Sequence, residues 1–370
     1  MATSPQAAID GAKVQAFIGR MLGDLGALTN SVLVHVGDQL GFYKTLMKAG
    51  PMDSAALAKQ TGTAERLVRE WLSAQAAQGY VTYDRSTQKF SLSPEQAMVF
   101  ADEESEFFMA GFFDIARGLF HDVPKIVNAF RTSGAMAWHE HNGCLFCGTQ
   151  RIFRPAYNHH LVNDWLPALD GVLAKLQKGC SVADVGCGQG ASAILMAKAF
   201  PNSKFFGYDY HAESIEAARK SAHDAGVGDR ISFETAAAKN FPAMGFDLIC
   251  FFDCLHDMDD PVGAARHVGT ALAADGTWMI VEPFANDRLE DNLNPVGAVF
   301  YAASTAVCTP GSLAQEVGLA LGAQAGEARL KKSGHGWRLQ TLPPCRRDPL
   351  QSDIGSKIVV EAGGEVPIRF

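Results

Sequence analysis

The chain has 370 residues, of which 47% are hydrophobic and 19% charged, and its formal net charge is -8. This composition is ordinary for a globular protein, and the negative charge argues against a nucleic-acid binder with a basic surface overall. We find no apolar run of the roughly 20 residues that span a bilayer and no signal peptide, so we expect a cytoplasmic protein. Eight cysteines are scattered along the chain. We interpret those in or beside expected strands as small buried side chains in a reducing compartment, namely Cys180, Cys187, Cys250 and Cys254.

Residues 1–110 predict a small all-α domain with a two-stranded wing. Apolar residues recur at helical spacing over 33–46, and two short helices are expected at 54–60 and 64–77. A hairpin is expected from 79 to 92, which completes the order of a winged helix. Its second helix offers only Arg66 and Arg69, offset by two glutamates, which is poor equipment for a phosphate backbone. We therefore favour dimerisation over DNA binding for this domain.

Residues 111–175 are expected to form a helical connector or lid, rich in Phe and irregular near 133–150. His139, His141, Cys144 and Cys147 lie in this stretch at spacings that suit Zn²⁺. The pattern lacks a second Cys pair, so we favour a pocket-edge loop without metal. Further on, Arg154 and Tyr157 precede the first expected strand, from which they could reach a ligand.

Residues 176–330 alternate short apolar strands with helices. Strands are expected at 182–185, 204–208, 231–235, 247–252 and 277–281, and helices at 191–200, 212–225 and 261–273. This alternation predicts an α/β fold with a Rossmann-like, doubly wound parallel sheet.

A glycine-rich turn follows the first strand of this region. Gly186, Gly188 and Gly190 allow a tight turn and the close approach of a ligand, and the next helix points its amides at that ligand. A dinucleotide is the competing interpretation, but Asp184 would repel a pyrophosphate and attract the ammonium group of a methionine moiety. Asp209 ends the second strand, where a carboxylate can bind both ribose hydroxyls.

The segment Asp-Val-Gly-Cys-Gly-Gln-Gly at 184–190, followed by Gly207-Tyr-Asp209, resembles the class I S-adenosylmethionine-dependent methyltransferases over about residues 178–325. The resemblance implies that Asp184 and the glycines hold the methionine end of S-adenosylmethionine and that Asp209 holds the ribose. Ala237 and Ala238 would lie near the adenine, although many relatives carry an acid there. Tyr210 and Phe252, at the ends of the second and fourth strands, complete the predicted cofactor site.

The segment Leu-His256-Asp257 after the fourth strand resembles the motif of small-molecule O-methyltransferases that carry a winged-helix domain. The resemblance implies that His256 is the general base, oriented by Asp257, and that the N-terminal domain forms a homodimer. The alternatives are that His256 is a loop or cap residue and that Asp257 caps the following helix. We expect a small-molecule acceptor and neither nucleic acid, membrane nor metal as a partner. A ligand-sensing transcriptional regulator and a protein that binds the cofactor without transferring its methyl group remain open.

Residues 331–370 form an atypical tail. Paired prolines and few apolar residues disfavour the strand that is expected here, and strand-like runs come only at 358–361 and 366–370. An allowed set of codons for 337–355, read one base later, resembles the closing strands of the family. We therefore hypothesise a frameshift near 331–336, and expect a sheet without its usual edge if the tail is natural.

Overall fold

The computed structural model describes residues 9–333, 340–341 and 356–362. It divides into two compact units. Unit 1 comprises residues 1–118 and 143–155, and unit 2 comprises 119–142 and 156–370. The expected connector at 111–175 is therefore shared between the two units.

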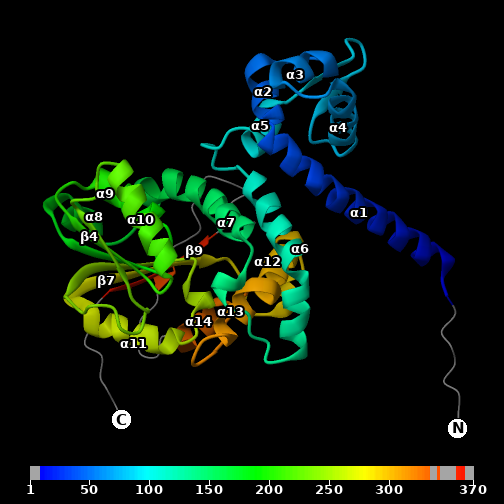
Figure 1. Cartoon of the computed structure of the whole chain (residues 1–370). Coiled ribbons are helices and arrows are strands. Elements are labelled where there is room, and N and C mark those ends of the chain that lie inside the picture. The colour runs from blue at the N-terminus through cyan, green and yellow to red at the C-terminus, as the bar shows by residue number, and fades with distance from the viewer. Residues whose placement is uncertain (1–8, 334–339, 342–355, 363–370) are drawn as a thin grey trace, which may run out of the picture. The chain divides into compact units, whose positions relative to one another are not determined.

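Unit 1 begins with α1 (Gly11–Gln39), a helix of 29 residues that extends well beyond the bundle of α2 to α5 (Figure 1). Gly41, with a φ of 69°, ends this helix and starts α2, so the single helix expected over 33–46 is wrong. The other elements of the winged helix are α2 (Phe42–Ala49), α3 (Ser54–Thr61), α4 (Glu65–Ala77), β1 (Thr82–Asp84), β2 (Lys89–Ser91) and α5 (Pro94–Phe100). Trp71 anchors its core and donates from Nε1 to the carbonyl oxygen of Leu33 at 2.7 Å.

The segment after the wing is largely helical, as expected. The stretch expected to be irregular becomes helical again at Gly143, where α7 begins. The helices of this part are α6 (Ala110–Arg131), η1 (Trp138–Glu140), α7 (Gly143–Ala156), the π-helix η2 (Tyr157–Trp165) and α8 (Val172–Lys178).

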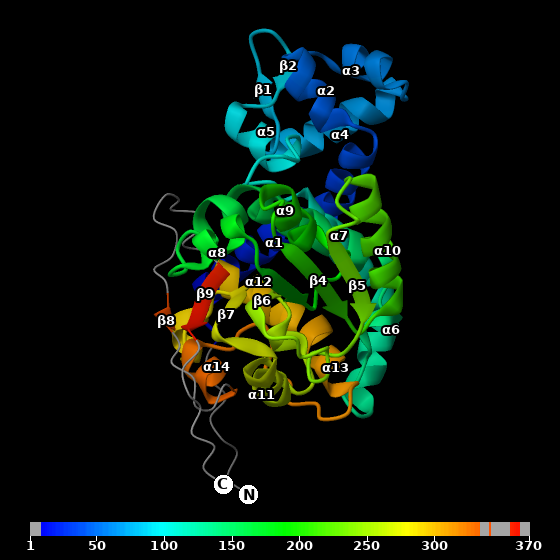
Figure 2. The same cartoon turned by 90° about the vertical axis from the view of Figure 1, so that its left-hand side faces the viewer.

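Unit 2 is built on a seven-stranded sheet in the order β5-β4-β3-β6-β7-β9-β8. The five expected strands are present and parallel, as β3 (Ser181–Val185), β4 (Lys204–Asp209), β5 (Ile231–Thr235), β6 (Phe246–Phe252) and β7 (Leu272–Pro283). Helices α9 (Ala191–Ala199) and α10 (Ala212–Asp224) cover one face and α11 (Pro261–Ala271) the other (Figures 1 and 2). Because the order of strands reverses between β3 and β6, a ligand crevice is expected at their carboxyl ends.

The tail contributes the far edge of this sheet. β9 (Ser356–Ala362) pairs antiparallel with β7, and β8 (Gln340–Thr341) pairs antiparallel with β9. The strand-like run at 358–361 is therefore confirmed, and the expected loss of the sheet edge is wrong. The second run, at 366–370, lies outside the described residues, as does most of the segment on which the frameshift hypothesis rests.

After β7 the chain continues as a series of short helices. Its elements are η4 (Leu289–Asn292), α12 (Pro295–Ala303), the π-helix η5 (Ser304–Cys308), α13 (Thr309–Leu313) and α14 (Glu327–Ser333). By length and composition alone, Pro295–Leu313 would suit a membrane span. That is weak support for a membrane, because core helices pass the same test, and Ser304, Val307 and Cys308 of this stretch are buried in the unit.

Candidate active site

The turn between β3 and α9 holds a buried carboxylate with spare hydrogen-bonding capacity. Asp184 is 1% exposed, and its Oδ2 accepts from the Ser192 hydroxyl at 2.5 Å. Within the described part of the chain, Oδ1 has no hydrogen-bond partner. Burial raises the pKa of Asp184 to about 7. An ammonium group beside Oδ1 would satisfy this oxygen and favour the charged carboxylate.

The glycines of the turn serve two different purposes. Gly190 has a φ of 79°, and a Cβ there would come within 2.6 Å of the Phe233 ring, so it permits close packing of turn and sheet. Gly188 has a φ of 51°, and no described atom lies within 4 Å of the place where its Cβ would stand. Bare backbone therefore borders open space at Gly188, as a ligand that lies along the chain requires.

Asp209 ties the end of β4 to this turn. Its Oδ2 accepts from the amide of Gly188 and its Oδ1 from the amide of His211, both at 2.9 Å. Burial raises its pKa above the usual value. Each carboxylate oxygen can accept a second hydrogen bond, so the two together can still receive the hydroxyls of a ribose.

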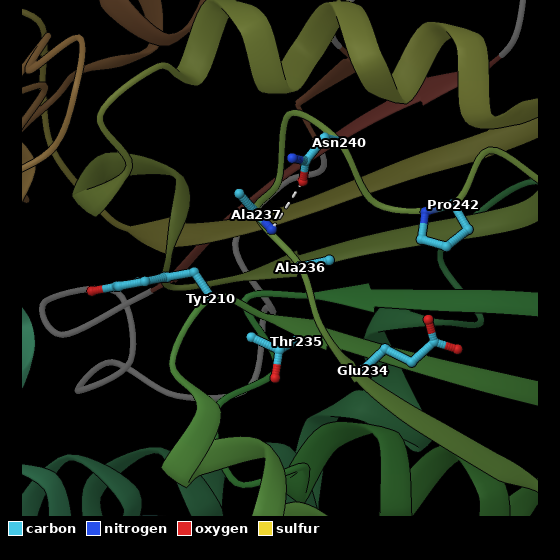
Figure 3. Close-up of a pocket in the computed structure, with 7 residues that line it drawn as sticks. All are labelled: Tyr210, Glu234, Thr235, Ala236, Ala237, Asn240 and Pro242. Carbon is cyan, nitrogen blue, oxygen red and sulfur yellow. Dashed lines mark hydrogen bonds between the residues drawn. The ribbon is translucent and has the colours of Figure 1, made fainter.

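A pocket of about 470 Å³ adjoins Tyr210, the residue that follows Asp209 in the chain (Figure 3). Tyr210 and Ala237, both predicted for the cofactor, line it together, and the amide of Ala237 donates to Oδ1 of Asn240 at 3.1 Å. The other lining residues are Glu234, Thr235, Ala236, Asn240 and Pro242. Ala238 instead packs, partly buried, against the core of the sheet. Glu234 supplies an acid to this pocket from β5, three residues before the position where the expected family acid is missing.

Phe252 and Asp253 end β6 beside the turn. Phe252 is buried against the rings of Tyr157 and Trp165, with centroids 5.6 and 6.4 Å away. Asp253 has a left-handed φ of 51°, and its Oδ2 accepts from the Tyr157 hydroxyl at 3.3 Å. Burial, reinforced by the charge of Glu282, raises the pKa of Asp253 to about 8.

His256 lies between two carboxylates on the turn η3 (Leu255–Asp257). Its Nδ1 is hydrogen-bonded to Oε2 of Glu282, whose other oxygen accepts from the Leu255 amide at 2.7 Å. Its Nε2 lies 3.2 Å from Oδ1 of Asp257. Burial alone would lower the pKa of His256, but the charges of Asp257 and Glu282 outweigh it and raise that pKa well above the usual value. Asp257 does not cap α11, because Asp260 accepts from the Gly263 amide and fills that role.

The four residues that the sequence offered as a zinc site fall on both sides of the division between the two units. His139 and His141 belong to unit 2, whereas Cys144 and Cys147 belong to unit 1. Arg154, also in unit 1, pairs with Glu104 at 3.0 Å. Tyr157 belongs to unit 2, where its hydroxyl group donates to Asp253 at the end of β6.

Sequence reasoning missed three groups that complete this site. Asp253 and Glu282 are acids at the ends of apolar strands, a signal that was available. Cys308 interacts with both His256 and Asp257, but nothing in its surroundings in the sequence marks it.

Comparison with known proteins agrees with this geometry. Residues 176–319 match the family model of a methyltransferase domain. Residues 176–319 are a methyltransferase domain. Residues 28–101 match an Rv2258c-like winged helix-turn-helix domain, so the predicted order of the two domains is confirmed. The match also supports the predicted cofactor, S-adenosylmethionine.

Curated relatives align with the methyltransferase domain only in part. A 27-O-demethylrifamycin SV methyltransferase of Amycolatopsis mediterranei is 33% identical over 103 residues, which are 27% of this chain and 38% of the relative. Methyltransferase GfsG of Streptomyces halstedii is 29% identical over 130 residues, which are 35% of this chain and 46% of the relative. The chain thus spans less than half the length of each.

Solved structures match along nearly the whole chain. Mitomycin 7-O-methyltransferase MmcR is 20% identical with a TM-score of 0.66, and the match covers 96% of this chain and all of that one. Human N-acetylserotonin methyltransferase, solved in complex with SAM, is 15% identical with a TM-score of 0.66, covering 97% and 100%. At these identities the matches confirm the predicted fold class: a Rossmann-like methyltransferase sheet preceded by a winged helix.

Proposed function

We propose that the chain is an S-adenosylmethionine-dependent methyltransferase that methylates an oxygen atom of a small molecule. The observation that carries this proposal is the buried Oδ1 of Asp184, which has no hydrogen-bond partner among the described residues, together with the bare backbone of Gly188 on the turn that follows. A cationic ligand that lies along the turn would give Oδ1 of Asp184 a partner and would cover the backbone of Gly188. The relatives' names, among them O-methyltransferases of small metabolites, agree in chemistry.

Three parts of the methyltransferase domain would hold the cofactor. Asp184 would pair with the ammonium group, Asp209 would accept from the ribose hydroxyls, and Tyr210 and Ala237 would border the adenine in the pocket. Ala238 and Phe252 would support this surface from behind. When bound, S-adenosylmethionine supplies the electrophilic methyl group.

The acceptor would lie at the carboxyl ends of β6 and β7. A hydroxyl group becomes a better nucleophile when a base takes its proton, and His256 is the candidate from the sequence. In this role Glu282 would hold Nδ1–H, and Nε2, which faces Oδ1 of Asp257, would accept the proton of the acceptor from the neutral form of the ring. Tyr157 and Asp253 provide further polar groups at the same strand ends.

The experiment is a methyl-transfer assay with S-adenosylmethionine and a panel of hydroxylated small molecules, preceded by calorimetry with the cofactor alone. We expect micromolar or tighter cofactor binding, and a kcat that falls about 10²- to 10⁴-fold in His256→Ala. His223→Ala, a histidine exposed on α10, is the matched control. Turnover that survives unchanged in His256→Ala would remove the base role, and heat-free calorimetric traces would remove the whole proposal. Binding without turnover on any panel member would favour a protein that does not transfer the methyl group.

A transcriptional regulator is the second candidate, because the N-terminal family model is a winged helix-turn-helix. The charges of α4 disfavour it. Arg66 pairs with Glu70 at 2.5 Å and Arg69 with Glu65 at 2.8 Å, so both arginines are neutralised within their own helix. Little positive charge is left on this helix for phosphates.

The predicted homodimer is also part of the proposal. Helix α1 exposes large apolar side chains along its length, including Phe17, Leu22, Leu25 and Val32. A surface of this kind marks an interaction site, and a second copy of α1 is the simplest partner. Light scattering should give twice the chain mass, and Phe17→Asp with Leu25→Asp should give monomers. We propose the cytoplasm as the location, since the eight cysteines are scattered and do not have the spacing of a disulfide framework.

A further inference from the structure

Asp253 has an unusual backbone conformation at the end of β6. Its φ of 51° lies in the left-handed region, which few residues other than glycine adopt. Its amide donates to the carbonyl oxygen of Val281 on β7 at 2.7 Å, so the neighbouring strand holds the backbone in this conformation. Such conformations are concentrated at functional sites. What this one changes is the direction of the Asp253 side chain.

The left-handed backbone turns the Asp253 side chain to the other face of the sheet. Side chains alternate along a strand, so a regular continuation of β6 would place Asp253 on the face opposite to Phe252. Instead, its Oδ2 accepts from the Tyr157 hydroxyl at 3.3 Å, and the ring of Tyr157 lies against Phe252, with centroids 5.6 Å apart. The Asp253 carboxylate therefore lies on the same side of the sheet as Phe252.

Asp184 lies on that side as well. In the parallel pairing of β3 with β6, Asp184 is opposite Cys250, and paired residues of neighbouring strands share a face. Cys250 and Phe252 are two residues apart on β6, so they also share a face. The two acids thus lie on one side of the sheet, near the carboxyl ends of adjacent strands.

The residue after Asp253 contacts the cofactor turn directly. The thiol of Cys254 donates to the carbonyl oxygen of Val185 at 3.3 Å. A Cβ at Gly186 would come within 2.8 Å of the Cβ of Cys254, so this close approach requires glycine. The end of β6 therefore lies against the turn that follows Asp184.

Each of the two acids has one carboxylate oxygen without a partner. Oδ1 of Asp184 and Oδ1 of Asp253 are buried, and neither makes a hydrogen bond within the described part of the chain. Buried polar atoms normally have a partner, which a ligand can supply. An ammonium group carries a positive charge and three N–H donors, so a single group can donate to both oxygens.

The surroundings of Asp253 favour a cation. Burial is the largest of the causes that raise the pKa of Asp253 to about 8, and the charges of Glu282 and Asp257 add to it. The charge of His256 and the hydroxyl of Tyr157 act in the opposite direction and do not outweigh these causes. A cation beside the carboxyl would favour its ionised form. An ammonium group that binds here should therefore displace a proton.

We propose that Asp253 is a second carboxylate ligand for the ammonium group of the cofactor, with Tyr157 holding its other oxygen. The inference rests on the proposed function, since S-adenosylmethionine supplies the ammonium group. The group would lie between Asp184 of β3 and Asp253 at the end of β6. Two carboxylates would also discriminate against nucleotides, because they repel phosphate groups.

The test compares two ligands that differ in the amino-acid end. S-adenosylhomocysteine carries the ammonium group, whereas 5′-methylthioadenosine lacks the whole amino-acid end and keeps the adenine and ribose. By calorimetry at pH 8, Asp253→Asn should bind S-adenosylhomocysteine about 10- to 100-fold more weakly than the wild type, because a hydrogen bond to a charged group is lost. Its affinity for 5′-methylthioadenosine should be unchanged. A merely structural role of Asp253 would weaken the binding of both ligands.

The release of protons gives a second readout, which depends on charge. Calorimetry in phosphate and in Tris buffers, whose ionisation enthalpies differ, counts the protons released when S-adenosylhomocysteine binds. With pKa values of about 7 for Asp184 and about 8 for Asp253, the wild type should release more than one proton per ligand at pH 7, and Asp253→Asn about half of one. Asp224→Asn, exposed on α10, is the matched control and should release as many protons as the wild type.

Two results would overturn the second ligand while cofactor binding stands. One is an affinity of Asp253→Asn for S-adenosylhomocysteine equal to that of the wild type, and the other is a release of protons that this variant does not reduce. A wild type that does not bind S-adenosylhomocysteine would instead remove the proposed function, and this inference with it. Asparagine tolerates the left-handed region, and Asp253→Gly is a second variant if Asp253→Asn does not fold.

Discussion

The substitution Asp184→Asn tests the cofactor site at its most specific contact. The change keeps the size of the side chain and its bond to Ser192 but removes the charge that would face the ammonium group. Removing one partner of a buried charge pair costs about 2–5 kcal/mol. This corresponds to a loss of affinity of about 30- to 4,000-fold. The ligand is S-adenosylhomocysteine, which has the same ammonium group and does not react, and the assay is isothermal calorimetry at pH 8.

The pH dependence makes the test sharper. With a pKa of about 7, the Asp184 carboxyl is mostly ionised at pH 8 and mostly protonated at pH 6. Only the ionised form pairs with an ammonium group, so its titration should lower wild-type affinity about tenfold between pH 8 and pH 6. The affinity of Asp184→Asn should fall less than that of the wild type over this range. Asp224→Asn, exposed on α10, is the control. The assignment would be refuted if Asp184→Asn bound the ligand within threefold of the wild-type affinity at pH 8. It would also be refuted if the affinity of the variant fell between pH 8 and pH 6 as much as that of the wild type.

Four further outcomes are expected. The pKa values of Asp184 and Asp253 are raised, so the folded chain binds protons more tightly than the unfolded chain. Without ligand, the Tm measured by calorimetry should therefore fall from pH 6 to pH 8.5. Asp253→Asn should reduce this dependence of Tm on pH. Gly190→Ala should lower the free energy of unfolding by about 1–3 kcal/mol in urea titrations, because its Cβ meets the Phe233 ring; a Tm equal to the wild type's would contradict this. Winged-helix DNA binding should be absent from pull-downs at low salt, and specific capture of a duplex would revive the regulator. An independent read of the gene across codons 331–336 tests the frameshift hypothesis, which an uninterrupted frame rules out.

The parallel sheet and its cofactor turn could be predicted because their signals are local. Each strand is a short apolar run beside a helix, and the acid and glycines of the turn lie within seven residues. The break between α1 and α2 also had a local signal, since Gly41 interrupts the apolar pattern. The sequence alone could not show whether Gly41 ends the helix, because apolar residues continue at helical spacing on both sides of it.

The surroundings of His256 could be predicted only in part, because the side chains around it come from distant parts of the sequence and meet only in the folded chain. Glu282 reaches His256 because β7 lies beside β6 in the sheet. The sequences of these two segments do not reveal the order of the strands. Cys308 reaches the same histidine through the π-helix η5, whose wider turn no periodicity predicts. Asp122 and His141 meet across a connection that reads only as irregular. The Leu-His-Asp motif identifies His256 in the sequence, but its contacts with Glu282 and Cys308 are known only from the structure.

Glu282 is the residue on which the proposed base role of His256 depends. A neutral imidazole carries one proton, and the carboxylate on Nδ1 places that proton away from the acceptor. In that neutral form Nε2 presents a lone pair, which can take the proton of a hydroxyl group. Glu282 is fixed by the end of β7 and by the Leu255 amide, so the tautomer is set by the same sheet that positions Asp184 and Asp209. The two ends of the site are therefore aligned by one rigid element, as a direct transfer between a cofactor and an acceptor requires.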